Sequence, residues 1–340
     1  MYNKEMSALK KLCSLFVCLA LCLSLCACEK GTKQEKAGSE EEALGHFLED
    51  LRSGDYAMAQ TYLYPENRLG WVLKAAGGEE SVPELDEVYR AVAAGWKDLT
   101  CSVSVDNETS QFVSFYDVTG QTRDYDAALR AGMAAALQEQ AETGGAAFSD
   151  LAGWMKAAVE SAEMGETDEA QPSVVKNSSG YSIDHRGYPD VHFLNLITGG
   201  FYEYIDMSMT TCTMKQSGVS YTYYLAAMGD EVVGYLQEVV ETYDPADLTE
   251  ENVTAYQAAC AAYAEGMEGV YMGAHVQDGD RLVTSTAIDF NTASQTAMIN
   301  AGIVSGRYSG NTTSNYLSLS ATIKGFESEG MTCVTTPTFP

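Results

Sequence analysis

Apolar positions in the first half of the chain recur mostly at helical spacing, and a few short stretches follow a strand pattern. Leu44, Phe47 and Leu51 lie on one face of a helix that Ser53-Gly54 ends. The pattern predicts helices over residues 44–52, 55–63, 83–96 and 191–204, and two more within residues 124–162, parted by Gly144-Gly145. It predicts strands over residues 101–105 and 112–116, and a hairpin over residues 173–183.

The second half of the chain alternates apolar and polar residues, as half-buried strands do. Val219, Tyr221 and Tyr223 share one face of a strand, so these tyrosines are expected on a sheet. The pattern predicts strands over residues 219–225, 232–243, 270–276, 282–290 and 331–335, and helices over residues 249–264 and 314–329. Thr249 is the expected N-cap of the first of these helices, because acidic residues follow it in the first turn.

The order of these elements predicts the fold class. Helices come first, then antiparallel strands with an inserted helical pair, and then a second set of antiparallel strands. Such separate runs predict an α+β fold rather than an alternating one. About 300 residues remain after the N-terminal segment, which favours two domains. We expect these domains over residues 40–205 and 206–340.

Three stretches of the first domain resemble the lipoprotein branch of the nuclear transport factor 2-like fold. They are Phe47–Gln60, Gly180–Ile183 and Phe193–Gly200. The resemblance rests on their order along the chain. It implies a cone-shaped arrangement of helices on a bent sheet, with a cavity that hosts Asp/His catalysis in some enzymes of this fold.

The second domain resembles the YehR-like lipoprotein family from about residue 222 to residue 334. The residues that carry the resemblance are Met228–Asp230, Leu248–Glu251, Glu265–Tyr271, Ala287–Phe290 and Phe326–Gly330. Members of this family are small bacterial lipoproteins whose biochemical role is not established. The resemblance therefore implies an antiparallel sheet with helices and a location at a membrane, but no reaction.

The N-terminal segment has the layout of a secretory signal. Lysines precede an apolar run from Leu12 to Leu25, which is shorter than the roughly 20 residues of a spanning helix. Leu25-Cys26-Ala27-Cys28 resembles the lipobox of bacterial lipoproteins, although a cysteine is unusual at its second position. We expect a signal peptide over residues 1–27, a diacylglycerol and palmitate anchor on Cys28, and a polar tether over residues 28–39. The protein is then extracytoplasmic and lipid-anchored to the cell membrane.

The charge of the chain limits its partners. The whole chain carries a formal charge of −28 at pH 7. Loss of residues 1–27 removes three lysines and one glutamate, so the remainder carries −30. So acidic a surface cannot neutralise many phosphates, which excludes nucleic acid as a partner. It also disfavours docking of the protein body on anionic lipid, so the lipid on Cys28 is the expected contact with the membrane.

Cysteine use agrees with export. Five of the nine cysteines lie within the first 28 residues, and the others are Cys101, Cys212, Cys260 and Cys333. These four are too far apart for a local metal motif, and they allow three disulfide pairings. Cys212 and Cys333 are the expected pair, because they lie in strand-like stretches near the two ends of the second domain. Cys260 shares helical spacing with Val253 and Tyr256, which predicts a buried thiol.

One cluster of residues could support acid–base chemistry. Asp184, His185, Asp190 and His192 lie close together in the sequence, and a carboxylate–imidazole pair can act as a general base or bind a metal. The favoured interpretation is structural. Asp190 is expected to cap the helix that follows Pro189, and the rest of the cluster to form a solvated loop. We expect no catalytic residue, metal or other cofactor.

Two further motifs are interpreted as structural. Asp278-Gly279-Asp280 has the acidic residues of a calcium loop but lacks the remaining ligands, and Asp-Gly favours a hairpin turn. Ser173 and Lys176 have the spacing of an acyl-serine motif. They lie on a predicted strand and lack the partner motifs of that enzyme class.

Three functions remain open on the sequence. The leading hypothesis is a non-enzymatic, membrane-anchored protein that binds a small ligand, a peptide or an envelope protein. The alternative is a hydrolase- or isomerase-type enzyme that uses the Asp/His cluster in the cavity of the first domain. A structural envelope protein is the third possibility, and a flat apolar patch would be its sign.

Overall fold

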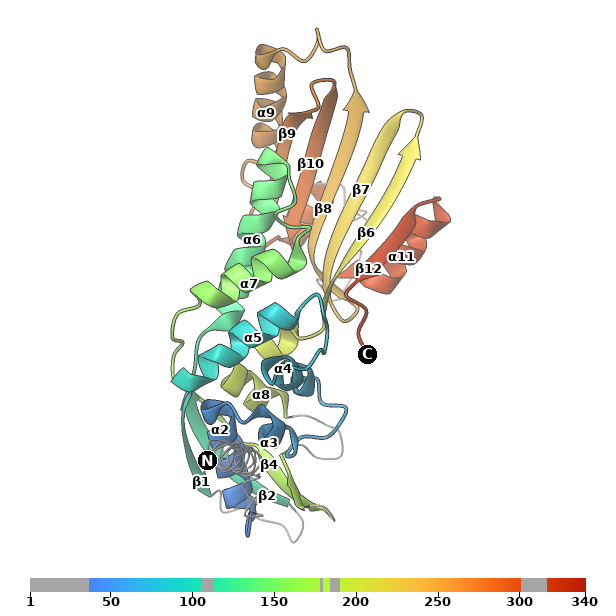
Figure 1. Ribbon diagram of the computed structural model, residues 1–340. Helices are drawn as coiled ribbons and strands as arrows, with labels where there is room; N and C mark the ends of the chain where they lie inside the picture. Colours follow the sequence, from blue (N-terminus) through green and yellow to red (C-terminus); the bar gives the residue numbers. More distant parts are fainter. Residues whose placement is uncertain (1–36, 106–112, 178–179, 184–189, 301–316) are drawn as a thin grey trace, which may run out of the picture. The chain divides into compact units, whose positions relative to one another are not determined.

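The computed structural model describes residues 37–105, 113–177, 180–183, 190–300 and 317–340. Within it, Ser39–Pro340 form one compact unit that contains helices and two antiparallel sheets (Figure 1). The α+β class expected from the sequence is confirmed. The expected boundary at residues 205 and 206 falls between the last short helix of the first half and the first strand of the second sheet. The division into two domains at that point stays a prediction.

Within the described ranges the first sheet has five strands, and helices of the first half pack on it. Its order is β1 (Thr100–Val105), β2 (Val113–Gln121), β4 (Ser173–Asn177) and β5 (Gly180–Ser182), and β3 (Asp168–Ala170) also pairs with β2. The helices are α2 (Glu40–Ser53), α3 (Tyr56–Gln60), α4 (Leu69–Ala76), α5 (Asp86–Ala94), η1 (Gly95–Asp98), α8 (Val191–Thr198) and η2 (Phe201–Tyr204). The expected helix over residues 191–204 is thus split in two, because Gly199 and Gly200 have positive φ angles of 56° and 81°.

Large aromatic side chains fill the core of this half. Phe47, Trp96, Phe193 and Phe201 are fully buried. Phe47 lies on the α2 stripe expected from the sequence, and its ring contacts Phe193 on α8 at a centroid distance of 6.4 Å. The Trp96 indole N–H donates to the Ile197 carbonyl at 2.9 Å, so this ring has both apolar contacts and a polar partner.

Among the described strands, seven form the second sheet. Their order is β12 (Thr332–Thr336), β6 (Met207–Gln216), β7 (Val219–Met228), β8 (Glu231–Thr242), β10 (Arg281–Asp289) and β9 (Val270–Gln277), and β11 (Leu317–Ser318) also pairs with β8. On one face, Leu225, Tyr235 and Ile288 form a core with α10 (Gln295–Asn300) and α11 (Leu319–Ser328). The sequence predicted most of these strands. For β6 it indicated only the stretch around Cys212.

The other face of the second sheet is covered by a long helix. Residues 124–162 form α6 (Tyr125–Thr143) and α7 (Leu151–Ser161), as the sequence predicted. The α6 residues Leu129 and Leu137 are fully buried, and α6 contacts β8, β9 and β10. Each such side chain contributes roughly 1.5–3 kcal/mol when buried. The helix backbone lies so close to β9 that a Cβ atom on Gly273 would stand 2.1 Å from the Ala141 carbonyl oxygen.

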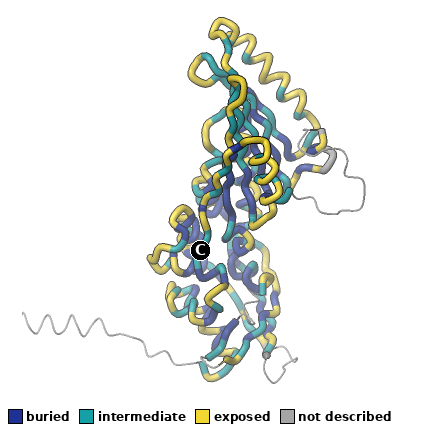
Figure 2. Tube along the Cα trace, turned by 90° about the vertical axis from the view of Figure 1, so that its right-hand side faces the viewer, coloured by how far each residue is buried: buried dark blue, intermediate teal, exposed yellow. Residues whose placement is uncertain are grey.

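The helix α9 (Glu250–Ala264) is attached much more loosely. It begins at the expected N-cap, because the Asn252 N–H donates to Thr249 Oγ1 at 3.3 Å. None of its residues is buried, and Figure 2 shows this helix at the top of the view, coloured mostly as exposed. The expectation of a buried Cys260 thiol is therefore wrong. Cys260 is half-buried and Tyr256 is 40% exposed, because α9 leans on the edge strand β9 rather than on a core.

Candidate functional site

The structure bears out the structural interpretation of Asp190. Its Oδ1 atom accepts the Phe193 N–H at 3.1 Å and so caps α8. His192 is exposed, and its Nε2 atom lies 2.7 Å from the Glu169 carbonyl oxygen. Asp184 and His185 lie outside the described residues, as does Cys28.

The structure also shows a turn at Asp278-Gly279. Both residues have positive φ angles, 54° and 85°, as a type I′ hairpin turn between two strands requires. The carboxylate of Asp278 pairs with Arg281 three residues later. Over the described ranges, no group of three or more His, Cys, Asp and Glu side chains is placed to hold a metal.

Among the cysteines that the structure describes, one disulfide is present, and it joins the pair expected from the sequence. Cys212 on β6 lies directly opposite Cys333 on β12, and their sulfur atoms are bonded. It links residues 121 positions apart and fastens the edge strand β12 to the sheet. Cys101 and Cys260 are free thiols, and burial raises the pKa of each. A raised pKa keeps a thiol in its neutral, less nucleophilic form.

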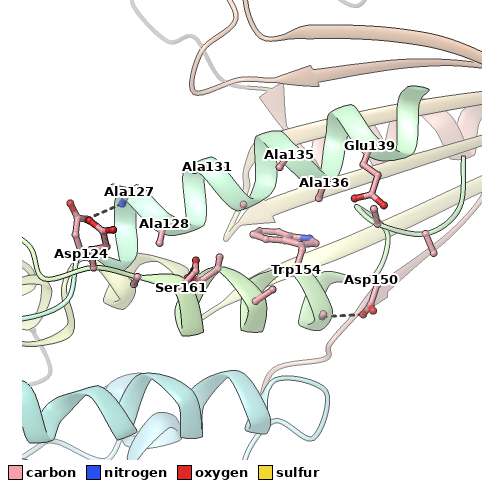
Figure 3. Close-up of a pocket in the computed structure, with 18 of the residues that line it drawn as sticks. Asp124, Ala127, Ala128, Ala131, Ala135, Ala136, Glu139, Asp150, Trp154 and Ser161 are labelled. Atoms are coloured by element: carbon pink, nitrogen blue, oxygen red, sulfur yellow. Dashed lines mark hydrogen bonds between the residues drawn. The ribbon is translucent and has the colours of Figure 1, made fainter. Parts of the chain in front are cut away.

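A groove of about 960 Å³ runs between α6 and α7 (Figure 3). Small side chains form both walls: Ala127, Ala131 and Ala135 stand on α6, and Ala157 and Ser161 stand on α7. All five are exposed.

The floor of this α6–α7 groove is set by a close helix–helix approach. A Cβ atom on Gly132 would stand 2.8 Å from the Cβ atom of Ala158, so only glycine fits there without movement of the helices. Trp154 lies beside this contact and is 7% exposed. Its indole N–H donates to the Phe148 carbonyl at 3.2 Å, which holds the ring between the two helices. A rigid aromatic ring therefore forms part of the floor.

The groove is acidic at both ends. Asp124 lies at one end, where its backbone N–H donates to the Glu163 carbonyl at 2.9 Å, and Glu139 and Asp150 lie at the other. Asp124 and Asp150 also cap the two helices, since they accept the N–H groups of Ala127 at 2.9 Å and Gly153 at 3.1 Å. Carboxylates at helix N-termini are stabilised by the helix dipole. None of the described residues that line the groove is basic.

The nearest cations on these helices are paired elsewhere. Arg130 donates to Asp126 at 2.9 Å, and Lys156 lies 3.3 Å from Glu87. Hydrogen bonds from Lys156 and Arg90 lower the pKa of Glu87, which keeps this carboxylate charged beside its cations. The four carboxylates of the groove are therefore available to a positively charged partner.

Gln140 connects the groove to the sheet beneath it, and the sequence did not single it out. It is fully buried, and its Oε1 atom accepts the N–H groups of Phe148 and Ser149 at 2.9 and 3.0 Å. Its Nε2 atom donates to Glu238 on β8 at 3.0 Å. One amide thus fixes the α6–α7 connection against the sheet. A glutamine within a helix rich in Ala, Gln and Glu carries no sequence signal for such a role.

The lining of the α6–α7 groove suits binding better than catalysis. Among the described residues that line it, Ser161 alone carries a hydroxyl group, and its Oγ atom donates to the Ala158 carbonyl at 2.8 Å. Among the described lining residues no histidine or lysine stands near that hydroxyl to act as its base. The groove offers a long concave surface, small side chains and negative charge.

Comparison with known proteins gives a likeness in fold alone. No family model and no curated protein matches this chain. The NMR structure of the Escherichia coli YehR protein has 14% sequence identity and a TM-score of 0.31, and the similarity covers 39% of this chain and 94% of that one. An NMR structure of a protein from Streptococcus pneumoniae TIGR4 has 12% identity and a TM-score of 0.29, over 37% of this chain and 85% of that one. The nuclear transport factor 2-like resemblance stays a prediction. No helix within the described residues is long and apolar enough to cross a membrane.

Proposed function

We propose that this protein is a membrane-anchored, non-enzymatic binding protein outside the cytoplasm. Lipid on Cys28 holds it at the membrane, and the α6–α7 groove binds a basic amphipathic helix of an envelope partner. The observation that carries the proposal is the groove itself. The groove has a floor of small residues and one tryptophan, and carboxylates lie at both of its ends.

A helix is the occupant that fits the walls of this groove. Both walls are helices whose backbone groups are bonded within the helix, so they have no backbone hydrogen bonds to offer a strand. Small residues let a third helix approach closely, near the short end of the 8–10 Å range of interaxial distances. A 19-residue helix such as α6 is roughly 28 Å long, so a partner helix of about 15–18 residues would span the groove.

Charge decides which helix would bind. Lysine or arginine near each end of the partner helix would face Asp124 and Glu163 at one end of the groove, and Glu139 and Asp150 at the other. The formal charge of −28 on the whole chain would also speed the approach of a basic partner. An acidic helix of the same apolar pattern would be repelled at both ends.

The anchor is tested by two matched cysteine substitutions. The full-length chain is expressed in a bacterium with radiolabelled palmitate, and membranes are separated from the soluble fraction. The unchanged chain and Cys26→Ala should carry label and sediment with membranes. Cys28→Ala should carry no label and should not be cut before residue 28. Equal labelling of Cys28→Ala would rule out this anchor.

The groove is tested with a synthetic helix. An 18-residue peptide with an alanine and leucine face and lysines at both ends is titrated onto the full-length chain in neutral detergent, and helix formation is followed by circular dichroism. Ala131→Trp and Ala157→Trp should each weaken binding by about tenfold or more, since they fill the groove. Ala258→Trp, on the exposed face of α9, is the matched control and should bind as before. Binding that survives both groove substitutions would contradict the proposal.

A further inference from the structure

The last described strand of the second sheet, β9, has a described neighbouring strand on one side only. Its backbone N–H and C=O groups therefore point alternately toward that neighbour and away from it. Among the described strands, β9 is the last in its sheet and pairs only with β10. In an antiparallel pair, alternate residues direct both backbone groups at the partner strand. The Asp289 N–H donates to the Gly269 carbonyl at 2.8 Å, in register with the pairing of Val270 and Ile288. Odd-numbered residues of β9 therefore face β10, and even-numbered residues face the free edge.

Two hydrogen bonds of the structure agree with this alternation. The Val270 N–H donates to the Met267 carbonyl at 3.2 Å, outside the ladder with β10. The Ala274 carbonyl accepts a hydrogen bond from Gln257 Nε2 on α9 at 3.0 Å. Met272 lies midway between these residues, so its N–H and carbonyl point to the same edge. A strand laid beside β9 could exchange two hydrogen bonds with Met272.

A groove borders this edge of the sheet. The groove measures about 590 Å³ and lies between α9, the C-terminal end of α6 and residues 270–274 of β9. Five strand residues span roughly 17 Å, the length of an added segment of five residues. Met272 and Tyr271 lie on its strand side, and Ala261 and Ala264 lie on its helix side. The helix side of the groove is thus lined by small side chains beside Met272.

The groove also selects for charge. Glu142 from α6 and Glu265 from the end of α9 line it, and no described lining residue is basic. A positively charged side chain on the added strand would meet both carboxylates. The helix α9 contacts β9 along this edge, so it obstructs the approach of a whole second sheet.

We propose that the groove along β9, here called the β9 groove, binds an extended basic peptide of a partner protein as an additional strand of the sheet. Main-chain hydrogen bonds to Met272 would give the affinity, and Glu142 and Glu265 would favour lysine or arginine. This is β-augmentation in a groove between an edge strand and a helix. It is a second binding site, and it differs from the α6–α7 groove in residues and in the form of its ligand.

The test uses the chemistry of the peptide backbone. A blocked hexapeptide of sequence Thr-Val-Lys-Val-Lys-Thr is compared with two isomers that carry N-methyl groups on alternate residues. The full-length chain is labelled with ¹⁵N-methionine, and the Met272 amide signal is assigned with Met272→Leu. The unmethylated peptide should shift the Met272 signal. One N-methyl isomer should bind about tenfold or more weakly, because its donors on the side facing β9 are lost, and the other should bind nearly as well.

Substitutions in the protein provide a second readout. Met272→Pro removes the edge donor, and proline is tolerated on an edge strand when its missing N–H faces outward. This variant should bind the peptide about tenfold more weakly. If it fails to fold, the double variant Glu142→Gln/Glu265→Gln should still show weakened binding of the lysine peptide. Ala131→Trp in the α6–α7 groove should leave this binding unchanged, so failure here is separable from failure of the proposed function.

Three results would overturn the inference. Equal binding of both N-methyl isomers would show that the backbone does not pair with β9. No shift of Met272 at about 1 mM peptide would show that the edge is closed to this class of ligand. A dimer in analytical ultracentrifugation that Met272→Pro abolishes would assign the edge to a second copy of the chain.

Discussion

The α6–α7 groove and the β9 groove share α6 as a wall. They differ in whether their walls leave backbone hydrogen-bonding groups unpaired. The α6–α7 groove lies between two helices, whose backbone groups are bonded within each helix, so it can recognise a partner only by shape and charge. The β9 groove lies between a helix and the edge of a sheet, where the backbone of Met272 faces the opening. The first therefore suits a helix and the second suits a strand.

The difference follows from how the two flanking helices are held. On α6, Leu129, Met133 and Leu137 are buried, and a Cβ atom on Gly273 would clash with its backbone. On α9 no residue is buried, and Gln257 supplies a side-chain hydrogen bond to the strand. A tightly packed helix closes the surface beneath it. A loosely packed helix leaves a strand edge open.

The largest effect should come from the disulfide at the opposite edge of the sheet. Cys212→Ser/Cys333→Ser removes a link between residues 121 positions apart, which should lower the free energy of unfolding by about 2–5 kcal/mol. Urea denaturation measures this loss. Because β12 and β9 are at opposite ends of the sheet, peptide binding at β9 should persist while the variant is folded. Cys260→Ser, at a free half-buried thiol, is the control and should cost less than about 1 kcal/mol.

The next effect should come from the contact that α6 makes with β9. Gly273→Val places side-chain atoms where the backbone of Ala141 and Glu142 now lies, and should cost about 1–3 kcal/mol in urea denaturation. It should weaken ligands of both grooves, since α6 is a wall of each. Gly325→Ala on α11 is the matched control, because no atom lies within 4 Å of the new Cβ position. A gain of a few tenths of a kcal/mol is expected there.

A smaller effect should follow loss of the hydrogen bond that holds α9 to the strand. Gln257→Ala should cost about 0.5–1.5 kcal/mol and should speed amide hydrogen exchange in α9 more than in α6. Gln138→Ala, which removes an exposed bond to Glu142 on α6, should cost less than this. Equal exchange in α6 and α9 of the Gln257→Ala chain would contradict the difference drawn between the two helices.

The smallest effect concerns pH. Burial lowers the pKa of His275, and Glu238 partly opposes this shift. The imidazole lies against Gly144 at the end of α6. The unfolded chain then takes up this proton first, so this contribution to stability should be complete above about pH 6.5 and should fall as the pH drops below 6.5. In the His275→Gln chain the urea midpoint should depend less on pH in this range. An unchanged dependence on pH would assign the effect to other titratable groups.

Much of the fold could be predicted because local patterns and packing agree. The α2 stripe of Leu44 and Phe47, the Asp190 cap and the turn at Asp278-Gly279 all follow from spacing and turn chemistry, and the structure has each of them. The pattern failed on α9. Val253, Tyr256 and Cys260 have helical spacing, but spacing alone does not say whether a helix will meet a core or only a strand edge.

The two grooves could not be predicted for a related reason. The α6–α7 groove depends on the approach of Gly132 to Ala158, two small residues that leave no sequence signal. Gln140 became a structural residue only because the sheet lies beneath it. The open edge depends on strand order, which places β9 last in the sheet, and strand order is set by long-range pairing.

The measurement that tests this difference most directly is amide hydrogen exchange at single residues of β9 in the full-length chain. The Met272 amide faces the groove, whereas the amides of Tyr271 and Gly273 face β10. Met272 should exchange about a hundredfold faster than either neighbour, while the amides in the middle of α6 remain protected. Exchange at Met272 as slow as at Tyr271 and Gly273 would show that the edge is already paired, and would contradict an open strand edge in the β9 groove.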